Sequence, residues 1–105
     1  MAQFFAYKNA NPKTRHQYPY LLDIQSDLLS ELKTTVVIPL SPAEIAAPMS
    51  LTRLNPSCTL DGQVFIVRTQ DIAGIDRSQL RGQAYDLTAY RSEVMAAVDF
   101  ILSGI

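Results

Sequence analysis

The sequence predicts a mainly β protein that ends in one α-helix. Three observations lead to this prediction. Apolar runs are mostly strand-like until about the last twenty residues, an Asp-Gly pair separates two of these runs, and the apolar spacing then changes to three and four. With 105 residues, 48% of them hydrophobic, the chain has the length and composition of one ordinary domain. We therefore expect a single domain over residues 1–105.

The first two expected strands flank a polar loop. Residues 3–7 (QFFAY) form a short aromatic run, and residues 18–24 (YPYLLDI) form a second apolar run. Pro19 has no N–H to donate, so it belongs at the start or on an edge of the second strand. Between the two runs, residues 8–17 are rich in Asn, Pro and Lys, which is typical of a surface loop.

A third strand is expected at residues 34–40 (TTVVIPL), where β-branched side chains dominate. Pro39 should limit how far its hydrogen-bonded ladder can run, because proline lacks the donor. Residues 43–49 and 71–83 show no clear period. We expect only turns or short pieces of structure there.

A β-hairpin is expected around Asp61-Gly62. This pair lies between residues 58–60 and 63–67, and it can supply the positive φ angles that a tight hairpin turn requires. Cys58 falls in the first of these strands, where we expect a small buried residue without a reactive role.

The final segment has helical periodicity. Spacings of three and four place its apolar residues on one stripe of a helix from about Leu87 to about Ser103. The stripe comprises Leu87, Tyr90, Val94, Ala97, Val98, Ile101 and Ile105. Asp86 or Thr88 can cap the first turn, and Gly104 can take the left-handed conformation that often follows a helix. The stripe should lie on the sheet, and Met95 and Leu102 should face water.

Composition excludes several classes of protein. The net charge of −1 shows no basic bias, so direct binding of nucleic acid without a partner is not expected. A single cysteine excludes an internal disulfide and the paired-thiol zinc patterns. We find no signal peptide, no apolar run long enough to span a membrane and no phosphate-binding glycine loop. We expect a cytoplasmic protein without a metal or cofactor.

Four short motifs resemble a known family. DIQSD (23–27), VIPL (37–40), TQDIA (69–73) and the final Gly-Ile occur in the order and approximate spacing seen in CcdB toxins. The chain resembles this family over almost its whole length. The resemblance implies a homodimer of an SH3-like β-barrel of the CcdB/MazF type with a long C-terminal helix.

The resemblance also implies a function. CcdB proteins are toxins of type II toxin–antitoxin systems; they are not enzymes. They wedge into the DNA gyrase A-subunit dimer and trap the gyrase–DNA cleavage complex. The second implied partner is a CcdA-type antitoxin, whose disordered tail folds on the toxin and can remove it from gyrase. The toxin–antitoxin complex represses its own operon through DNA contacts of the antitoxin.

The resemblance transfers to particular residues of this chain. The implied gyrase-binding residues are Leu28, Leu29, Asp99, Leu102, Ser103, Gly104 and Ile105. Ser103 departs from the pattern, because the best-known member has a tryptophan before Gly-Ile, and Asp99 stands where that member has an asparagine. Two-fold symmetry would present the helix end twice to a symmetric target.

Other interpretations remain open for these residues. Ile105 can instead close the core stripe, and Leu28 and Leu29 can be strand-end packing. Independently of any motif, Ile45 and Met49 are predicted to receive apolar side chains of the antitoxin.

A ribonuclease resembling MazF or Kid is the alternative function on the same fold. It would need a proton acceptor, a proton donor and positive charge. The candidates are His16, Arg15, Lys13 and Lys8, all in one loop. A third possibility is a relic toxin that binds its antitoxin but has lost its target.

Overall fold

The computed structural model describes residues 2–46 and 53–104. Its strands are β1 (Phe5–Lys8), β2 (Tyr20–Asp23), β3 (Thr34–Pro42), β4 (Ser57–Leu60), β5 (Gln63–Val67), β6 (Ala73–Asp76) and β7 (Tyr85–Asp86). Its α-helices are α1 (Ala43–Ala46) and α2 (Arg91–Ser103). Short 3₁₀ turns lie at η1 (Asp27–Leu29), η3 (Thr69–Asp71), η4 (Arg77–Gln79) and η5 (Thr88–Tyr90). The predicted mainly β class with one long C-terminal helix is confirmed.

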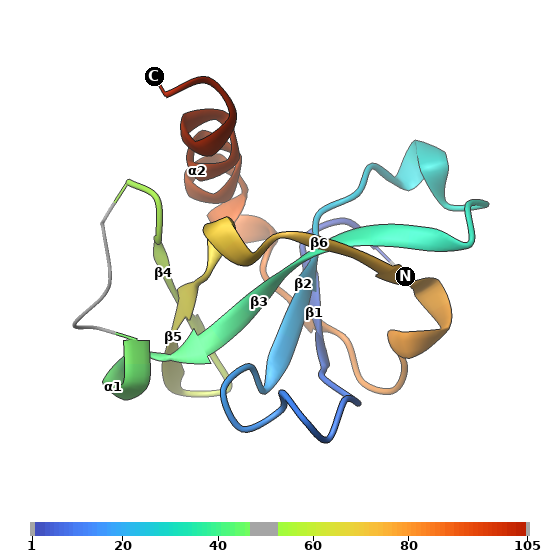
Figure 1. Cartoon of the computed structure of the whole chain (residues 1–105), viewed down its shortest axis with the longest axis horizontal. Coiled ribbons are helices and arrows are strands. Elements are labelled where there is room, and N and C mark those ends of the chain that lie inside the picture. The colour runs from blue at the N-terminus through green and yellow to red at the C-terminus, as the bar shows by residue number, and fades with distance from the viewer. Residues whose placement is uncertain (1, 47–52, 105) are drawn as a thin grey trace.

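The strands form one antiparallel sheet that curls into a nearly closed barrel (Figure 1). The strand order is β4-β5-β3-β2-β1-β7, and β6 pairs with the remaining part of β3. Between the two end strands, the backbone N–H of Thr59 in β4 donates to the hydroxyl of Tyr90 at 3.0 Å. Because Tyr90 follows β7 closely in the chain, this bond links the two ends of the sheet.

Pro39 does not end its strand, contrary to the expectation. β3 pairs with β6 through residues 34–37 and with β5 through residues 40–42, and Pro39 lies between these two ladders. Toward β2 it stands opposite Leu21, and on the other side it falls in the gap between the β5 and β6 ladders, so its missing N–H breaks neither of those two ladders. The carbonyl of Pro39 still accepts a bond from Arg68 N at 2.9 Å.

The predicted hairpin is confirmed, whereas β6 and β7 were not anticipated. Asp61 and Gly62 both have positive φ, 53° and 81°, as a tight turn between β4 and β5 requires. β6 has the sequence AGID, which carries little strand preference. It forms a strand because it pairs with the first half of β3.

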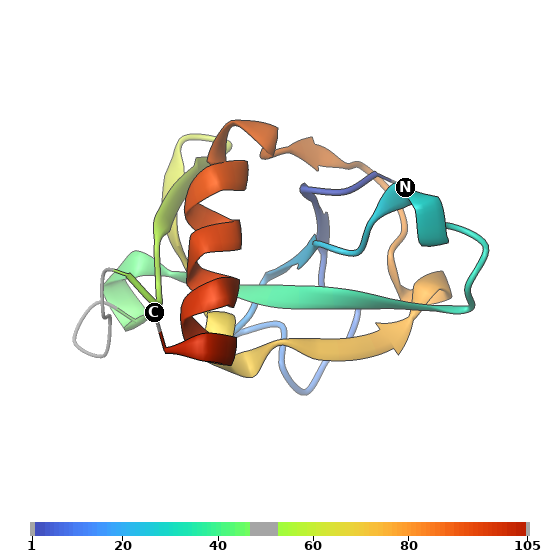
Figure 2. The ribbon, with the colours of Figure 1, turned by 90° about the horizontal axis from the view of Figure 1, so that it is seen from above.

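The barrel interior is filled by one apolar cluster, which α2 covers from one side (Figure 2). Its buried members are Phe4, Ala6, Leu22, Ile38, Leu40, Cys58, Leu60, Phe65, Val67, Leu87, Val94 and Val98. From α2 the buried side chains are Val94, Ala97 and Val98. The expected helical stripe therefore packs on the sheet over its central part.

Three details of the helix prediction are wrong. α2 begins at Arg91, because residues 88–90 form the separate 3₁₀ turn η5, and Asp86 accepts from Thr88 N at 2.9 Å where that turn begins. Met95 is half-buried against the core cluster. Ile101 is 37% exposed, since the last turn of α2 rises away from the sheet (Figure 1). Leu102 faces water as expected, and Ile105 lies outside the described residues.

Candidate functional site

Residues 26–34 follow β2, end at the first residue of β3 and expose three leucines, and we call this segment the leucine loop. The exposed fractions are 94% for Leu28, 48% for Leu29 and 50% for Leu32. Leu28 and Leu29 were predicted from the sequence, whereas Leu32 was missed. Its only signal is a further leucine in a polar stretch, which does not reveal exposure. Packing on the core therefore does not order these side chains.

Hydrogen bonds from outside the loop hold its backbone instead. Arg77 Nε donates to the carbonyl of Leu32 at 2.9 Å, and its Nη2 donates to the carbonyls of Leu29 at 3.2 Å and Thr34 at 3.4 Å. Gln25 Nε2 also donates to Thr34 O at 3.1 Å. Residues far apart in the chain thus fix the loop.

The beginning of the loop is anchored by carboxylates and a hydroxyl. Asp27 Oδ1 accepts from the backbone N–H of Gln3 at 2.8 Å, and Ser26 Oγ accepts from Leu28 N at 3.2 Å. Just before the loop, Asp23 is buried and accepts from the Thr35 hydroxyl at 2.7 Å. The DIQSD segment therefore supplies the polar atoms that shape the loop.

The second candidate surface is the end of α2. Leu102 is 80% exposed, and the Ser103 hydroxyl donates to the carbonyl of Asp99 at 2.7 Å. Gly104 has φ of 73° and donates its N–H to Phe100 O at 2.8 Å, so it ends the helix in the predicted left-handed conformation. Ile105 lies outside the described residues, so its predicted role is not addressed by the structure.

Within one chain the two surfaces lie apart. Figures 1 and 2 place the leucine loop and the end of α2 on different sides of the barrel. The residues predicted to bind gyrase therefore form two groups, one at Leu28 and Leu29 and one at Asp99 to Gly104. A single protomer does not join them.

A groove of about 640 Å³ runs between α2 and β4. Its lining includes Arg53, Ser57, Tyr90, Glu93 and Asp99. Asp99 thus borders both this groove and the end of the helix. Toward the C-terminal end of α2 the Arg53 guanidinium lies 4.6 Å from the centre of the Phe100 ring.

The predicted antitoxin contacts are only partly described. Ile45 in α1 is 54% exposed, which leaves its side chain accessible to a partner. Met49 lies outside the described residues.

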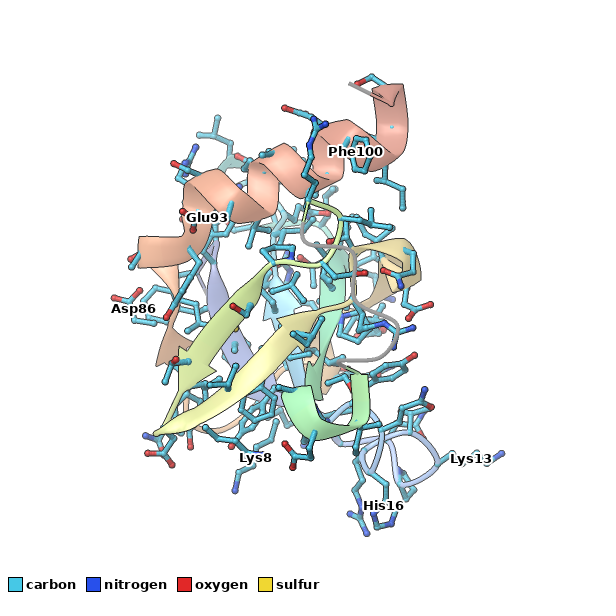
Figure 3. All side chains as sticks on the ribbon, turned by 90° about the vertical axis from the view of Figure 1, so that its left-hand side faces the viewer. Lys8, Lys13, His16, Asp86, Glu93 and Phe100 are labelled. Atoms are coloured by element: carbon cyan, nitrogen blue, oxygen red, sulfur yellow. The ribbon has the colours of Figure 1, made fainter. Side chains whose placement is uncertain are left out.

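The ribonuclease candidates do not surround one cleft. Lys8 and Arg15 line a cleft of about 260 Å³, but Lys13 and His16 are not part of its lining. Figure 3 shows Lys13 and His16 pointing outward from the loop. In the described ranges, no group of three or more His, Cys, Asp or Glu side chains is arranged to hold a metal ion.

Cys58 has the structural role expected of it. Its side chain is 3% exposed, and burial raises the pKa of the thiol to about 11. Because the thiolate is the nucleophile, a thiol of this kind is unreactive near neutral pH.

No helix within the described part of the chain is long and apolar enough to cross a membrane.

A protein-family model matches almost the whole chain. The family model described as CcdB protein matches residues 3–104. The match includes the leucine loop, α2 and Gly104, and therefore spans both candidate surfaces.

Proposed function

The chain belongs to the CcdB protein family, and we infer that it is the toxin of a type II toxin–antitoxin pair that binds the DNA gyrase A subunit. Family membership implies a gyrase poison rather than an enzyme. Trapping of the gyrase–DNA cleavage complex is the proposed mode of action. The match over residues 3–104 is the observation that carries this proposal.

Exposure of the candidate residues supports a protein-binding role. Large apolar side chains at loop tips and helix ends lose contact with water when a partner covers them. Leu28 and Leu102 are the two most exposed large hydrophobic residues among those described, at 94% and 80%. We propose that each contacts the gyrase A subunit. Their separation within a protomer agrees with a homodimer that brings surfaces from two chains to a symmetric target.

The end of α2 carries Ser103 where the best-known family member has a tryptophan, so it offers a partner a different chemistry. Ser103 uses its hydroxyl on the helix backbone, so Leu102 is the apolar anchor at this end. The exposed carboxylate of Asp99 is proposed to pair with a basic residue of gyrase. Such a pairing weakens with added salt, whereas burial of Leu102 does not.

An antitoxin of the CcdA type is the proposed second partner. Ile45 is the accessible candidate contact, and Met49 stays a prediction. An Ile45→Asp protein should bind an antitoxin-tail peptide more weakly while it keeps its fold. Unchanged affinity in a titration would remove Ile45 from the contact surface. Neutralisation in the cytoplasm and repression of the shared operon through the antitoxin belong to the same proposal.

The decisive experiment is a gyrase assay on supercoiled plasmid with ATP. The intact protein should cause linear DNA to accumulate after denaturation of the trapped complex. Leu102→Asp and a chain lacking residues 104–105 should each need at least about tenfold more protein, because burial of one leucine or isoleucine side chain is worth about 1.5–3 kcal/mol. The matched control is Val64→Asp, a change at a 45% exposed apolar residue on β5.

Three results would argue against the proposal. If the intact protein yields no linear DNA, gyrase is not its target. If Val64→Asp is as defective as Leu102→Asp, the defect is not specific to the end of α2. If RNA is cleaved in a parallel incubation, the ribonuclease alternative replaces gyrase poisoning.

A further inference from the structure

The leucine loop combines high exposure with a well-defined backbone. None of its three leucines packs in the buried core clusters of the described residues, so the core does not hold the segment in one conformation. Short apolar loops without such packing sample many conformations, and each ordered residue costs about 1–2 kcal/mol of backbone entropy. The order of this loop must therefore come from polar contacts.

Arg77 provides the largest set of these contacts. Its guanidinium donates to three carbonyls of the loop, those of Leu29, Leu32 and Thr34, at 2.9–3.4 Å. Its own backbone N–H donates to Lys33 O at 2.7 Å. Among residues 2–46 and 53–104, no carboxylate lies within ion-pair distance of it. The fork of N–H groups is thus directed at the loop backbone rather than at an acidic partner.

Arg77 is itself fixed by its local structure. It begins η4, where Asp76 Oδ1 accepts from Ser78 N at 2.9 Å and from the Ser78 hydroxyl at 2.6 Å. Gln25 shares the carbonyls of Leu29 and Thr34 with Arg77, but the only side-chain bond described for the Leu32 carbonyl comes from Arg77. The turn that carries Leu32 is therefore the part most dependent on Arg77.

We propose that Arg77 is a positioning residue for gyrase binding: it orders the leucine loop before the partner arrives, and Leu32 extends the apolar surface formed by Leu28 and Leu29. This inference rests on the proposed function of the loop. A pre-ordered loop does not have to be ordered during binding, so the partner binds with higher apparent affinity. Apparent affinity falls in proportion to the fraction of molecules in the competent conformation.

The test compares the wild-type protein with Arg77→Gln, Arg77→Lys and Arg81→Gln. Arg81 is the matched control, because it is four residues from Arg77 and its Nε donates locally, to Ser78 O at 2.9 Å. The Kd for purified gyrase A subunit should rise about tenfold in Arg77→Gln, if nine in ten loops become disordered. Arg77→Lys should recover part of the affinity, since lysine donates but cannot form the fork. Arg81→Gln should stay within about twofold of wild type.

Amide hydrogen exchange tests the positioning role without gyrase. The N–H groups of Leu29, Ser30 and Leu32 bond to carbonyls within the loop. Their exchange should accelerate in Arg77→Gln, whereas that of the core strands should stay as in wild type. Equal exchange rates at these three amides in wild type and Arg77→Gln would overturn the inference, even if wild type fails to bind gyrase. That failure alone would count against the proposed function.

A double-mutant comparison separates positioning from a general structural role. In a Leu28→Ala/Leu32→Ala background, Arg77→Gln should weaken gyrase binding much less than in wild type, because the ordered loop then presents little to bind. The same fold-loss in both backgrounds would mean that Arg77 acts elsewhere. Full affinity of Arg77→Gln, alongside a defective Leu28→Asp, would likewise overturn the inference.

Discussion

The two exposed apolar regions of this protein are held in place by different physics. The leucine loop is fixed by hydrogen bonds from Arg77 and Gln25 to its backbone carbonyls and by a bond from the backbone N–H of Gln3 to the Asp27 carboxylate. The end of α2 is fixed by regular helical bonds, and the helix is attached to the barrel through buried apolar side chains such as Val94 and Ala97. Both regions expose leucines, but only the helix is fastened to the core by packing.

The two regions should therefore respond to different kinds of mutation. Loss of apolar packing should release α2 and leave the leucine loop ordered. Loss of a polar contact should loosen the loop with little effect on global stability, because the loop contributes no residue to the buried core cluster. The following predictions test this separation, from the largest expected effect to the smallest.

Ala97→Asp should have the largest effect, because Ala97 has no exposed surface and packs between α2 and the barrel. Burial of an unpaired carboxylate should lower the free energy of unfolding by about 3 kcal/mol or more. The matched control is Ala96→Asp, one residue earlier and exposed. Urea unfolding measures both. Equal stability of the two variants would show that packing does not attach the helix.

Gly104→Ala should have an intermediate effect confined to the last turn of α2. A Cβ at this position meets no neighbouring atom, but the φ of 73° is unfavourable for alanine by about 1 kcal/mol. Amide exchange should accelerate at Gly104, whose N–H bonds to Phe100 O, and stay unchanged in the leucine loop. Gly104→Asn should fray less, since asparagine tolerates this conformation. A loop that changes together with the helix end would contradict the separation.

Asp27→Ala should loosen the beginning of the leucine loop by about 0.5–1 kcal/mol, because Gln3 N loses its carboxylate acceptor. Global stability in urea should change little. Asp27→Asn, which keeps an acceptor oxygen, should retain most of the protection. Exchange at Leu29 and Ser30 measures the effect. If both variants behave identically, this hydrogen bond does not order the loop.

Acid should slightly loosen two turns, η4, which carries Arg77, and η5, which precedes α2. Hydrogen bonds from Ser78 lower the pKa of Asp76 at η4, and bonds from Thr88 lower that of Asp86 at η5. A pKa depressed in the folded state adds stability above the ordinary value of 3.8, and this stability is lost as the pH falls through the lower folded value. NMR titration of the two carboxyl groups should give midpoints below 3.8. Midpoints at or above 3.8 would show that these hydrogen bonds do not favour the charged form of either carboxyl group.

Much of the fold was predictable because local chemistry determined it. The turn at Asp61-Gly62 has the two positive φ angles that its residues permit, and Gly104 ends α2 for the same reason. β6 was not predictable, because its AGID sequence becomes a strand only through pairing with β3. The start of α2 was misplaced, since helical spacing continues through η5 although the backbone there is a 3₁₀ turn.

The binding role of the candidate residues stays a prediction, but their exposure and the contacts that support them can be compared with what the sequence indicated. Sequence motifs identified Leu28 and Leu102, and both are highly exposed. The sequence could not connect Arg77 with the leucine loop, because Arg77 is 48 residues from Leu29 and 43 residues from Thr34, whose carbonyls accept from its Nη2 atom. Leu32 lacked a signal because a lone leucine in a polar segment is as consistent with burial as with exposure.

The bond between Thr59 N and the Tyr90 hydroxyl bears on solubility. β4 is the last strand in the sheet order. The carbonyl of Pro56, just before β4, accepts from Val67 N of β5. Because the bonding direction alternates along a strand, the backbone groups of Ser57 and Thr59 face the outer edge. Open sheet edges are templates on which further copies of a chain add strands and aggregate. The Tyr90 hydroxyl occupies the outward-facing N–H of Thr59 in this four-residue strand. It therefore shortens the free backbone edge to which a strand of another molecule could hydrogen-bond.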